Sequence, residues 1–462
     1  MATRTPSSDA VVTARYENAL RNAALRRRLG TRGRHSRPTS WSGAGQSPGP
    51  RRLASLDGLR GVAASVVLLH HILLSQPVFA GPYGDPSAAE VGSALWWLTY
   101  TPVHLIWAGT EAVFVFFVLS GMVLTLAAAP GRFSVWSYYP SRIIRLYVPV
   151  WVAVAFAAAL ATVVPPVWAE GSSWWMAANT HEPSTGGILH DAVLLFAPGT
   201  TNHVLWSLQW EVVFSLTLPL FLLVARAPGI RLWAKATVAV LAITIANEIG
   251  SVALSALSLF LLGTLMASGH QQLARIAQRI NASRNRGWFW AAVITATAVL
   301  TSAYWVVHAT GAQLAATDDI VSISRGLQAL GACMVVFVAW HWEPARTVLE
   351  SRPMQWLGVR SFSLYLVHLP VVTTVALVLG GRPPLELVIV LSVPLSLLVT
   401  VVFYRLVERP SHRLARACAT RFARAAGAEP EPPVVVDIPA QHGIHRHPQI
   451  DLRPLAAAGR VE

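Results

Sequence analysis

The chain has 462 residues, of which 54% are apolar and only 13% are charged, and its mean hydropathy is +0.49. This composition excludes an ordinary soluble protein and is typical of a chain that crosses a membrane many times. The formal net charge of +14 would suggest nucleic-acid binding in a soluble domain, so its position along the chain decides what it means.

The first 52 residues form a basic arm. They contain eleven arginines and two acids, with Ser, Gly and Pro scattered throughout, and they lack the short apolar core of a signal peptide. We expect residues 1–52 to be a disordered segment on the cytosolic side. Within it, residues 16–29 either stay solvated or form a basic helix on the lipid surface.

Ten apolar stretches follow, most of them close to the roughly 20 residues that a spanning helix needs. We therefore predict an all-α polytopic membrane protein with about ten transmembrane helices. The predicted spans cover residues 54–76, 104–126, 147–166, 206–225, 234–248, 252–268, 288–308, 321–340, 361–379 and 386–404.

The loops between these stretches differ in charge. With ten spans, the arginine-containing loops fall on the side of the basic arm, whereas residues 77–103, 167–205 and 309–320 contain acids but no Arg or Lys. By the positive-inside rule, both termini are cytosolic and the protein is a multi-pass protein of the inner (cytoplasmic) membrane. The positive charge is then a topology signal, so we expect the lipid bilayer and not nucleic acid as a partner.

The longest outer loop, residues 167–205, has tryptophans suited to a membrane interface and a short apolar piece from Ile188 to Phe196. We expect that piece to dip back into the membrane, so that the loop roofs an outer cavity. After Glu408-Arg409-Pro410 the chain is rich in Arg, Ala and Pro. This leaves residues 53–412 as one membrane domain and 413–462 as a disordered cytosolic tail.

The first predicted span carries an arginine and histidines into an apolar run. The eleven-residue step from Arg60 to His71 turns an α-helix through about 1100°, so both side chains lie within about 20° of one face and about 16 Å apart along the axis. His70 falls about 80° off that line. Ionisable residues inside a span usually face protein or a cavity and are candidates for function.

Further polar residues occur in later spans. Glu111 lies in the second span, where a carboxylate commonly pairs with a cation or relays protons. Arg142 and Arg145, at the cytosolic mouth of the third span, share one helix face and either form a phosphate clamp or are ordinary positive-inside residues. Glu211 and His368 lie in the fourth and ninth spans. The pair Ser120-Gly121 is more typical of a close helix–helix contact than of a nucleophile.

In this order the motifs resemble the acyltransferase-3 family of bacterial membrane O-acyltransferases. The resemblance covers residues 53–412. It departs from the family pattern at Glu111, where aspartate is common, and at Ser215, where a tyrosine often stands. Pro149 also comes one position later after the double arginine than in the family pattern. It rests on Leu56-Asp57-Gly58-Leu59-Arg60 with His71, Phe116-Phe117-Val118-Leu119-Ser120-Gly121, Arg142-x-x-Arg145, Trp206-Ser207-Leu208-x-x-Glu211-x-x-Phe214, Ser361-Phe362-Ser363-Leu364-Tyr365-Leu366-Val367-His368, and Glu408-x-Pro410.

The resemblance implies an enzyme that takes an acyl group, acetyl by default, from cytosolic acyl-coenzyme A and transfers it to a hydroxyl, usually of a glycan. Arg60 and His71 match the family's Arg-x10-His pair, and Arg142 and Arg145 its double arginine. Surface polysaccharide, peptidoglycan, glycolipid and a secreted small molecule such as a macrolide all remain open as acceptors. Some relatives carry an extracytoplasmic hydrolase-like domain, which this sequence lacks, so transfer would end in the membrane domain or on a separate partner.

From these residues we expect Arg60, Arg142 and Arg145 to bind the phosphates of the cofactor. His71 would act as general base or as an acyl-histidine nucleophile, with Glu111 orienting or charge-balancing it. The remaining candidates, Glu211, Tyr365 and His368, would bind the acceptor or support the site, although His368 could equally be a structural histidine.

The two cysteines have no metal-like spacing, so we expect neither a disulfide framework nor a bound metal. The alternative to an enzyme is a transporter or flippase of a glycan or lipid-linked substrate, for which many spans and intramembrane ionisable residues are also typical.

Overall fold

The computed structural model describes residues 53–128, 134–314 and 318–427, and every regular element within them is a helix. The all-α prediction is therefore confirmed for that part of the chain. The predicted basic arm, residues 1–52, and the predicted tail beyond residue 427 lie outside the described residues.

A helix lies at each of the ten predicted positions, but fewer than ten are established as spans. Seven helices are long and apolar enough to cross a membrane, or up to nine if each of two bent pairs forms one span. The pairs are α11 with α12, bent by 69°, and α13 with α14, bent by 53°. Helix α10 has only 17 residues. The helices at or beside the predicted spans, short and bent ones included, are α2 (Ala54–Leu74), α5 (Gly109–Ala127), α6 (Val135–Val163), α9 (Leu205–Arg226), α10 (Leu232–Glu248), α11 (Val252–Ser268), α12 (His270–Ala282), α13 (Arg286–Thr301), α14 (Ala303–Leu314), α15 (Asp318–His341), α17 (Arg352–Val378) and α18 (Leu385–Phe403).

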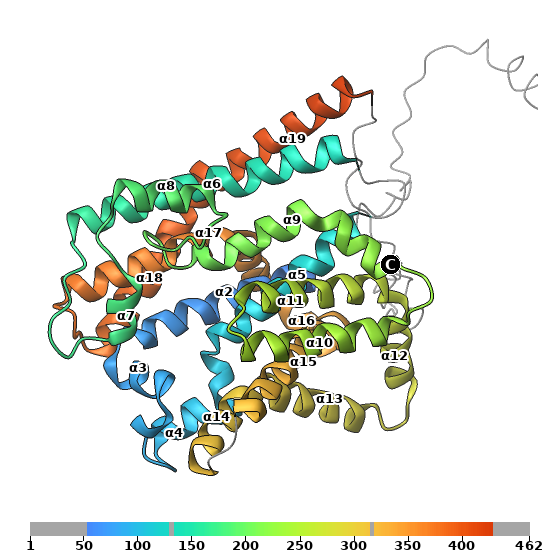
Figure 1. Cartoon of the computed structure of the whole chain (residues 1–462), viewed down its shortest axis with the longest axis horizontal. Coiled ribbons are helices and arrows are strands. Elements are labelled where there is room, and N and C mark those ends of the chain that lie inside the picture. Colours follow the sequence, from blue (N-terminus) through green and yellow to red (C-terminus); the bar gives the residue numbers. More distant parts are fainter. Residues whose placement is uncertain (1–52, 129–133, 315–317, 428–462) are drawn as a thin grey trace, which may run out of the picture. The chain divides into compact units, whose positions relative to one another are not determined.

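Short helices occupy the connections (Figure 1). The apolar piece of the loop 167–205 includes most of α8, which lies beside α6: the Tyr147 hydroxyl donates to the Val193 carbonyl at 2.9 Å, and the Trp151 indole to the Ala192 carbonyl at 3.0 Å. The loop thus folds back along a long apolar helix. The short elements are α3 (Pro77–Gly84), η1 (Pro86–Ala88), α4 (Ala94–Tyr100), η2 (Pro102–Ile106), α7 (Trp174–Asn179), α8 (Thr185–Val193) and α16 (Glu343–Leu349).

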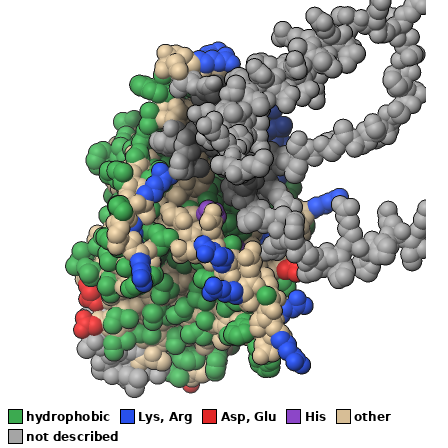
Figure 2. All heavy atoms as spheres, turned by 90° about the vertical axis from the view of Figure 1, so that its right-hand side faces the viewer, with side chains coloured by type: hydrophobic (Ala, Val, Ile, Leu, Met, Phe, Trp, Pro, Cys, Tyr) green, Lys and Arg blue, Asp and Glu red, His purple; other side chains and the backbone are tan. Residues whose placement is uncertain are grey.

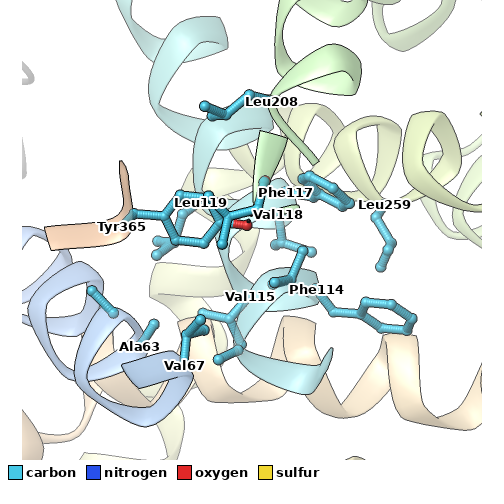
Figure 3. Close-up of a cluster of buried hydrophobic side chains, with 14 of the residues drawn as sticks. Ala63, Val67, Phe114, Val115, Phe117, Val118, Leu119, Leu208, Leu259 and Tyr365 are labelled. Carbon is cyan, nitrogen blue, oxygen red and sulfur yellow. Dashed lines mark hydrogen bonds between the residues drawn. The ribbon is translucent and has the colours of Figure 1, made fainter. Parts of the chain in front are cut away.

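Helix α5 lies at the centre of the apolar core. Figure 3 shows its side chains Phe114, Val115 and Phe117 among side chains from α2, α9, α11 and α17. A Cβ atom at Gly121 would collide with a backbone carbonyl of α11, and one at Gly263 of α11 with a carbonyl of α5. The Ser120-Gly121 motif is therefore confirmed as a close helix–helix contact, of the kind that small residues allow in membrane bundles.

Helices α2 and α17 approach one another in the same way. A Cβ at Gly61 would collide with the backbone of α17 at Gly358, and one at Gly358 with the carbonyl of Asp57. Only glycines permit such a short distance between helix axes. This contact brings together two motifs that are about 300 residues apart in sequence, and it sets His71 of α2 opposite His368 of α17.

The C-terminal end differs from our expectation. Helix α18 continues through a π-helical turn, η3 (Tyr404–Glu408), into α19 (Arg409–Ala425), which packs along α6 and buries Ala415 and Ala423. Residues 413–425 of the predicted disordered tail are therefore helical, because small side chains on one face of this arginine-rich segment fit against a neighbouring helix. For its part, α6 begins at Val135, twelve residues before the predicted span.

Candidate active site

The two helices bring two histidines into direct contact. His71 Nδ1 lies 2.8 Å from His368 Nε2, and the rings are stacked with their centroids 5.0 Å apart. His368 Nδ1 in turn lies 2.9 Å from the Leu364 carbonyl oxygen. Both side chains are buried.

These contacts fix which nitrogens carry protons when both rings are neutral. A carbonyl oxygen only accepts, so His368 Nδ1 carries the proton and donates to Leu364. His368 Nε2 is then an acceptor, and His71 Nδ1 must be the donor to it. The lone pair of His71 therefore lies on Nε2. A histidine held in one tautomer by a bond to its other nitrogen is the arrangement that a general base requires.

The neighbouring His70 has different partners, as the helical angle predicts. Its Nδ1 lies 2.9 Å from the Trp107 carbonyl oxygen, and its ring stacks on the Trp107 indole and meets the Tyr83 ring edge-on. His70 thus belongs to the packing between α2 and the loop before α5, and His71 to the contact with α17.

The structure contains a cavity of about 350 Å³ whose lining includes Arg60, Arg142 and Arg145. Three carboxylates, Asp57, Glu211 and Glu408, share it. The expected convergence of the three arginines is present in the structure, although their sequence positions place them on two helices.

The three arginines are not equivalent. Arg142 donates to Glu211 at 2.5 Å and to the Ser215 hydroxyl at 3.0 Å, and the side chains of this ion pair are only 14% and 18% exposed. Within the described residues, neither Arg60 nor Arg145 forms an ion pair or donates a side-chain hydrogen bond. Arg60 and Arg145 therefore retain free guanidinium donors, while Arg142 ties α6 to α9.

The inner end of the cavity is apolar. Val113, Phe116 and Phe117 of α5 and Leu208 of α9 line it, together with Tyr365 of α17 (Figure 3 labels Phe117, Leu208 and Tyr365). The Tyr365 ring lies 5.9 Å from the His368 ring, so the histidine pair sits directly behind this end. The Tyr365 hydroxyl is 2.6 Å from the Ser207 hydroxyl, which joins the motifs of α9 and α17.

Glu408 is a cavity residue whose role we did not predict, although the Glu-x-Pro pattern marked its position. Only 3% exposed, it accepts hydrogen bonds from the Ser363 backbone N–H, at 3.1 Å, and from the Ser363 hydroxyl. Its position in the π-helical turn η3 aims it at the cavity. Such turns are frequent at functional sites.

Glu111 does not contact His71, so our expectation that it orients the catalytic histidine was wrong. Its carboxylate accepts from the Trp305 indole at 2.7 Å and from the Gln328 amide, and one oxygen lies 3.9 Å from His104. At 3.9 Å, that approach is longer than a hydrogen bond. The partner of His71 is His368, which lies 297 residues away in sequence.

Glu211, which we expected to bind the acceptor or support the site, lines the cavity and pairs with Arg142; this position is compatible with a supporting role, and acceptor binding stays a prediction. Helix α9, which carries Glu211, begins beside the middle of α17, where the Val204 carbonyl accepts from the Tyr365 hydroxyl at 3.3 Å. Among the described residues, no group of three or more His, Cys, Asp or Glu is placed to hold a metal ion.

The chain is similar to known acyltransferases over most of this region. The family model described as an acyltransferase domain of the acyltransferase-3 type matches residues 53–405. A curated relative, Acyltransferase MdmB of Streptomyces mycarofaciens, is 28% identical over 363 residues, which cover 72% of this chain and 82% of the relative. No solved structure gives a significant match.

Proposed function

Because the chain belongs to the acyltransferase-3 family, and is thus a multi-pass membrane acyltransferase, we propose that it transfers a short acyl group, acetyl by default, from cytosolic acyl-coenzyme A to a hydroxyl of a glycan or a similar acceptor. One observation carries this proposal. A single cavity has arginines at one end and an apolar wall at the other, and a hydrogen-bonded histidine pair lies directly behind that wall.

The two ends of the cavity suit the two parts of acyl-coenzyme A. Guanidinium groups bind phosphates through paired, charge-assisted hydrogen bonds, and Arg60 and Arg145 have donors available for this. The thioester end of the donor carries no charge, and it fits against Phe116, Phe117 and Tyr365. Along α2, Arg60 and His71 are separated by about 16 Å, which an extended pantetheine arm can span.

The distribution of charged side chains supports an entrance to the arginine cavity from the cytosol. Figure 2 shows the face on the right of Figure 1, where α12 with its exposed Arg275 and Arg279 lies, and the charged side chains in view are mostly Arg and Lys. Helices α3, α4 and α7 lie at the opposite end, near outer-loop acids such as Asp85 and Glu90. By the positive-inside rule, we assign the arginine-rich face to the cytosolic side of the cytoplasmic membrane, in keeping with the cytosolic termini that the sequence predicts.

In the proposed reaction, His71 Nε2 accepts the proton of the acceptor hydroxyl while that oxygen attacks the thioester carbonyl carbon. The carbon–sulfur bond breaks, and the coenzyme A thiolate takes the proton back from His71. His368 is the positioning residue, because it holds His71 in the required tautomer and stabilises the imidazolium. An acyl-histidine route uses the same nitrogen as nucleophile, and trapping of a labelled acyl-enzyme distinguishes it.

The experiment uses purified full-length protein in liposomes with radiolabelled acetyl-coenzyme A, and measures free thiol and ester product. We expect His71→Asn to lower the rate about 100-fold or more, since Asn keeps a donor to His368 but has nothing in place of Nε2. The matched control is His70→Asn, which keeps the bond to Trp107.

Equal rates in His71→Asn and His70→Asn would overturn the assignment of the base. The transporter alternative is disfavoured by the family match. It would show substrate flux across the liposome without release of coenzyme A.

A further inference from the structure

The outer loop between α6 and α9 is fastened over the histidine pair at three points. The Ser173 hydroxyl donates to the Leu74 carbonyl at 2.5 Å, and the Trp174 indole to the Ala80 carbonyl at 2.8 Å. The Asn202 amide donates to the Leu366 carbonyl of α17 at 2.9 Å, two residues before His368. This part of the loop is therefore an ordered wall of the site.

These fastenings hold Trp175 beside His71 and His203 beside Trp175. The Trp175 ring lies 5.1 Å from the His71 ring, and the His203 ring stands perpendicular to the Trp175 indole at 5.6 Å. Trp175 is only 8% exposed, and His203 is half-buried. Neither residue lines the arginine cavity. His71 thus has a second set of neighbours on the loop side.

Several polar atoms in this wall lack partners. Within the described residues, the Trp175 indole N–H and both ring nitrogens of His203 make no hydrogen bond. The buried side-chain oxygens of Thr201 and Asn202 are also unpaired. Thr201 borders a further small cavity of about 30 Å³. Buried polar atoms without partners are costly, so a ligand hydroxyl that reaches the Thr201 or Asn202 oxygen is favoured, while the Trp175 and His203 nitrogens offer further hydrogen-bonding groups.

The loop backbone here is strained. Leu194 and Ala197 adopt left-handed conformations, with φ of 57° and 48°, which side chains other than glycine rarely adopt. Asp191 holds the following turn by accepting four backbone N–H groups, from residues 199 to 202, at 2.7–3.2 Å. The strained backbone and the Asp191 hydrogen bonds together keep Asn202 and His203 in place.

From these observations we propose that Trp175 and His203 bind the acceptor, a hydroxyl-bearing sugar ring, against His71 on the side away from the acyl-coenzyme A cavity. This rests on the proposed function. A sugar presents C–H groups on its faces and hydroxyls at its edge, which match an indole face and unpaired polar atoms. The arginine cavity instead suits an anion. Transfer forms the carbon–oxygen ester bond and breaks the carbon–sulfur bond, with His71 passing the hydroxyl proton to the thiolate.

The test measures transfer of labelled acetyl from acetyl-coenzyme A to a panel of methyl glycosides by purified full-length protein. We expect Trp175→Ala to raise the KM for the glycoside about tenfold or more while the KM for acetyl-coenzyme A stays within about twofold of wild type. Trp175→Phe, which keeps the ring, should show a smaller effect and guards against misfolding of the Ala variant. His203→Asn should act in the same direction as Trp175→Ala.

The matched control is Trp168→Ala, in the same outer loop, whose indole donates to the Thr180 hydroxyl at 2.8 Å and is not one of the three fastenings. An equal rise in the glycoside KM in Trp168→Ala and Trp175→Ala would reduce Trp175 to a packing residue and overturn the proposal. Thiol release by wild type without transfer to any glycoside would overturn the sugar-binding site while leaving the proposed function intact. Absence of thiol release would instead contradict the proposed function.

Discussion

The bond between His71 and His368 leads to a quantitative prediction, because two near-isosteric substitutions separate its parts. In His368→Gln the amide oxygen replaces Nε2 as the acceptor for His71. In His368→Asn the amide reaches only the position of Nδ1, so His71 loses its acceptor. We expect His368→Gln to keep most of the wild-type rate and His368→Asn to lose it.

The size of the loss follows from the 2.8 Å bond. His71 becomes positively charged during proton transfer, and a hydrogen bond to a charged group contributes about 1.5–3 kcal/mol. Since about 1.4 kcal/mol corresponds to a tenfold change in rate, we expect kcat in His368→Asn to fall by about 10- to 150-fold. The KM for acetyl-coenzyme A should not change, because His368 does not line the arginine cavity.

The assay follows thiol release at saturating acetyl-coenzyme A, with size-exclusion profiles and thermal unfolding recorded for each variant. A purely structural role for His368 would lower the unfolding temperature in both variants without separating their kcat values. Equal kcat in the Gln and Asn variants would refute the tautomer argument.

Four further predictions follow from individual contacts. Glu211→Gln should release Arg142 for phosphate binding and lower the KM for acetyl-coenzyme A by about 2- to 5-fold, since a partly exposed ion pair contributes up to about 1 kcal/mol; an increased KM would contradict this. Gly121→Ala should force α5 away from α11 and lower the unfolding temperature of the purified protein, whereas an unchanged value would mean that the contact is loose. Asp191→Asn should expose the outer loop to protease by weakening four hydrogen bonds, which limited proteolysis would detect; wild-type protection would contradict the proposed support. Burial and nearby His181 hold the pKa of His203 at about 4, so the unfolded state binds more protons between about pH 6.5 and 4; wild-type stability should therefore fall through that window more than in His203→Asn, and parallel unfolding curves would contradict it.

Much of the bundle could be predicted because membrane spans have a strong sequence signature. Long apolar runs place the helices, and the 3.6-residue period separates His71 from His70. The count of spans was less secure, since α10 is short and α13 bends into α14, and length alone does not decide whether such helices cross the membrane.

The partners of the site residues were harder to predict. No local pattern indicates that His71 meets His368, because the bond depends on glycine contacts between α2 and α17. Glu111 was misassigned for the same reason: its helix position was correct, but its side chain meets Trp305 from a distant helix. Trp175 was missed as a neighbour of His71, and His203 as a neighbour of Trp175, because both belong to the connection between α6 and α9, whose helices are too short for hydrophobic periodicity to be informative.

The most direct test of the central claim measures binding and chemistry separately in two variants. Arg145→Gln and His71→Asn are each examined for the Kd of coenzyme A and for kcat with saturating acetyl-coenzyme A. We expect Arg145→Gln to raise the Kd about tenfold or more with little change in kcat, since it removes a charge-assisted phosphate contact. We expect His71→Asn to leave the Kd unchanged and to lower kcat about 100-fold or more. Wild-type kcat in His71→Asn, or an unchanged Kd in Arg145→Gln, would contradict a site that binds the donor through its arginines and transfers the acyl group at His71.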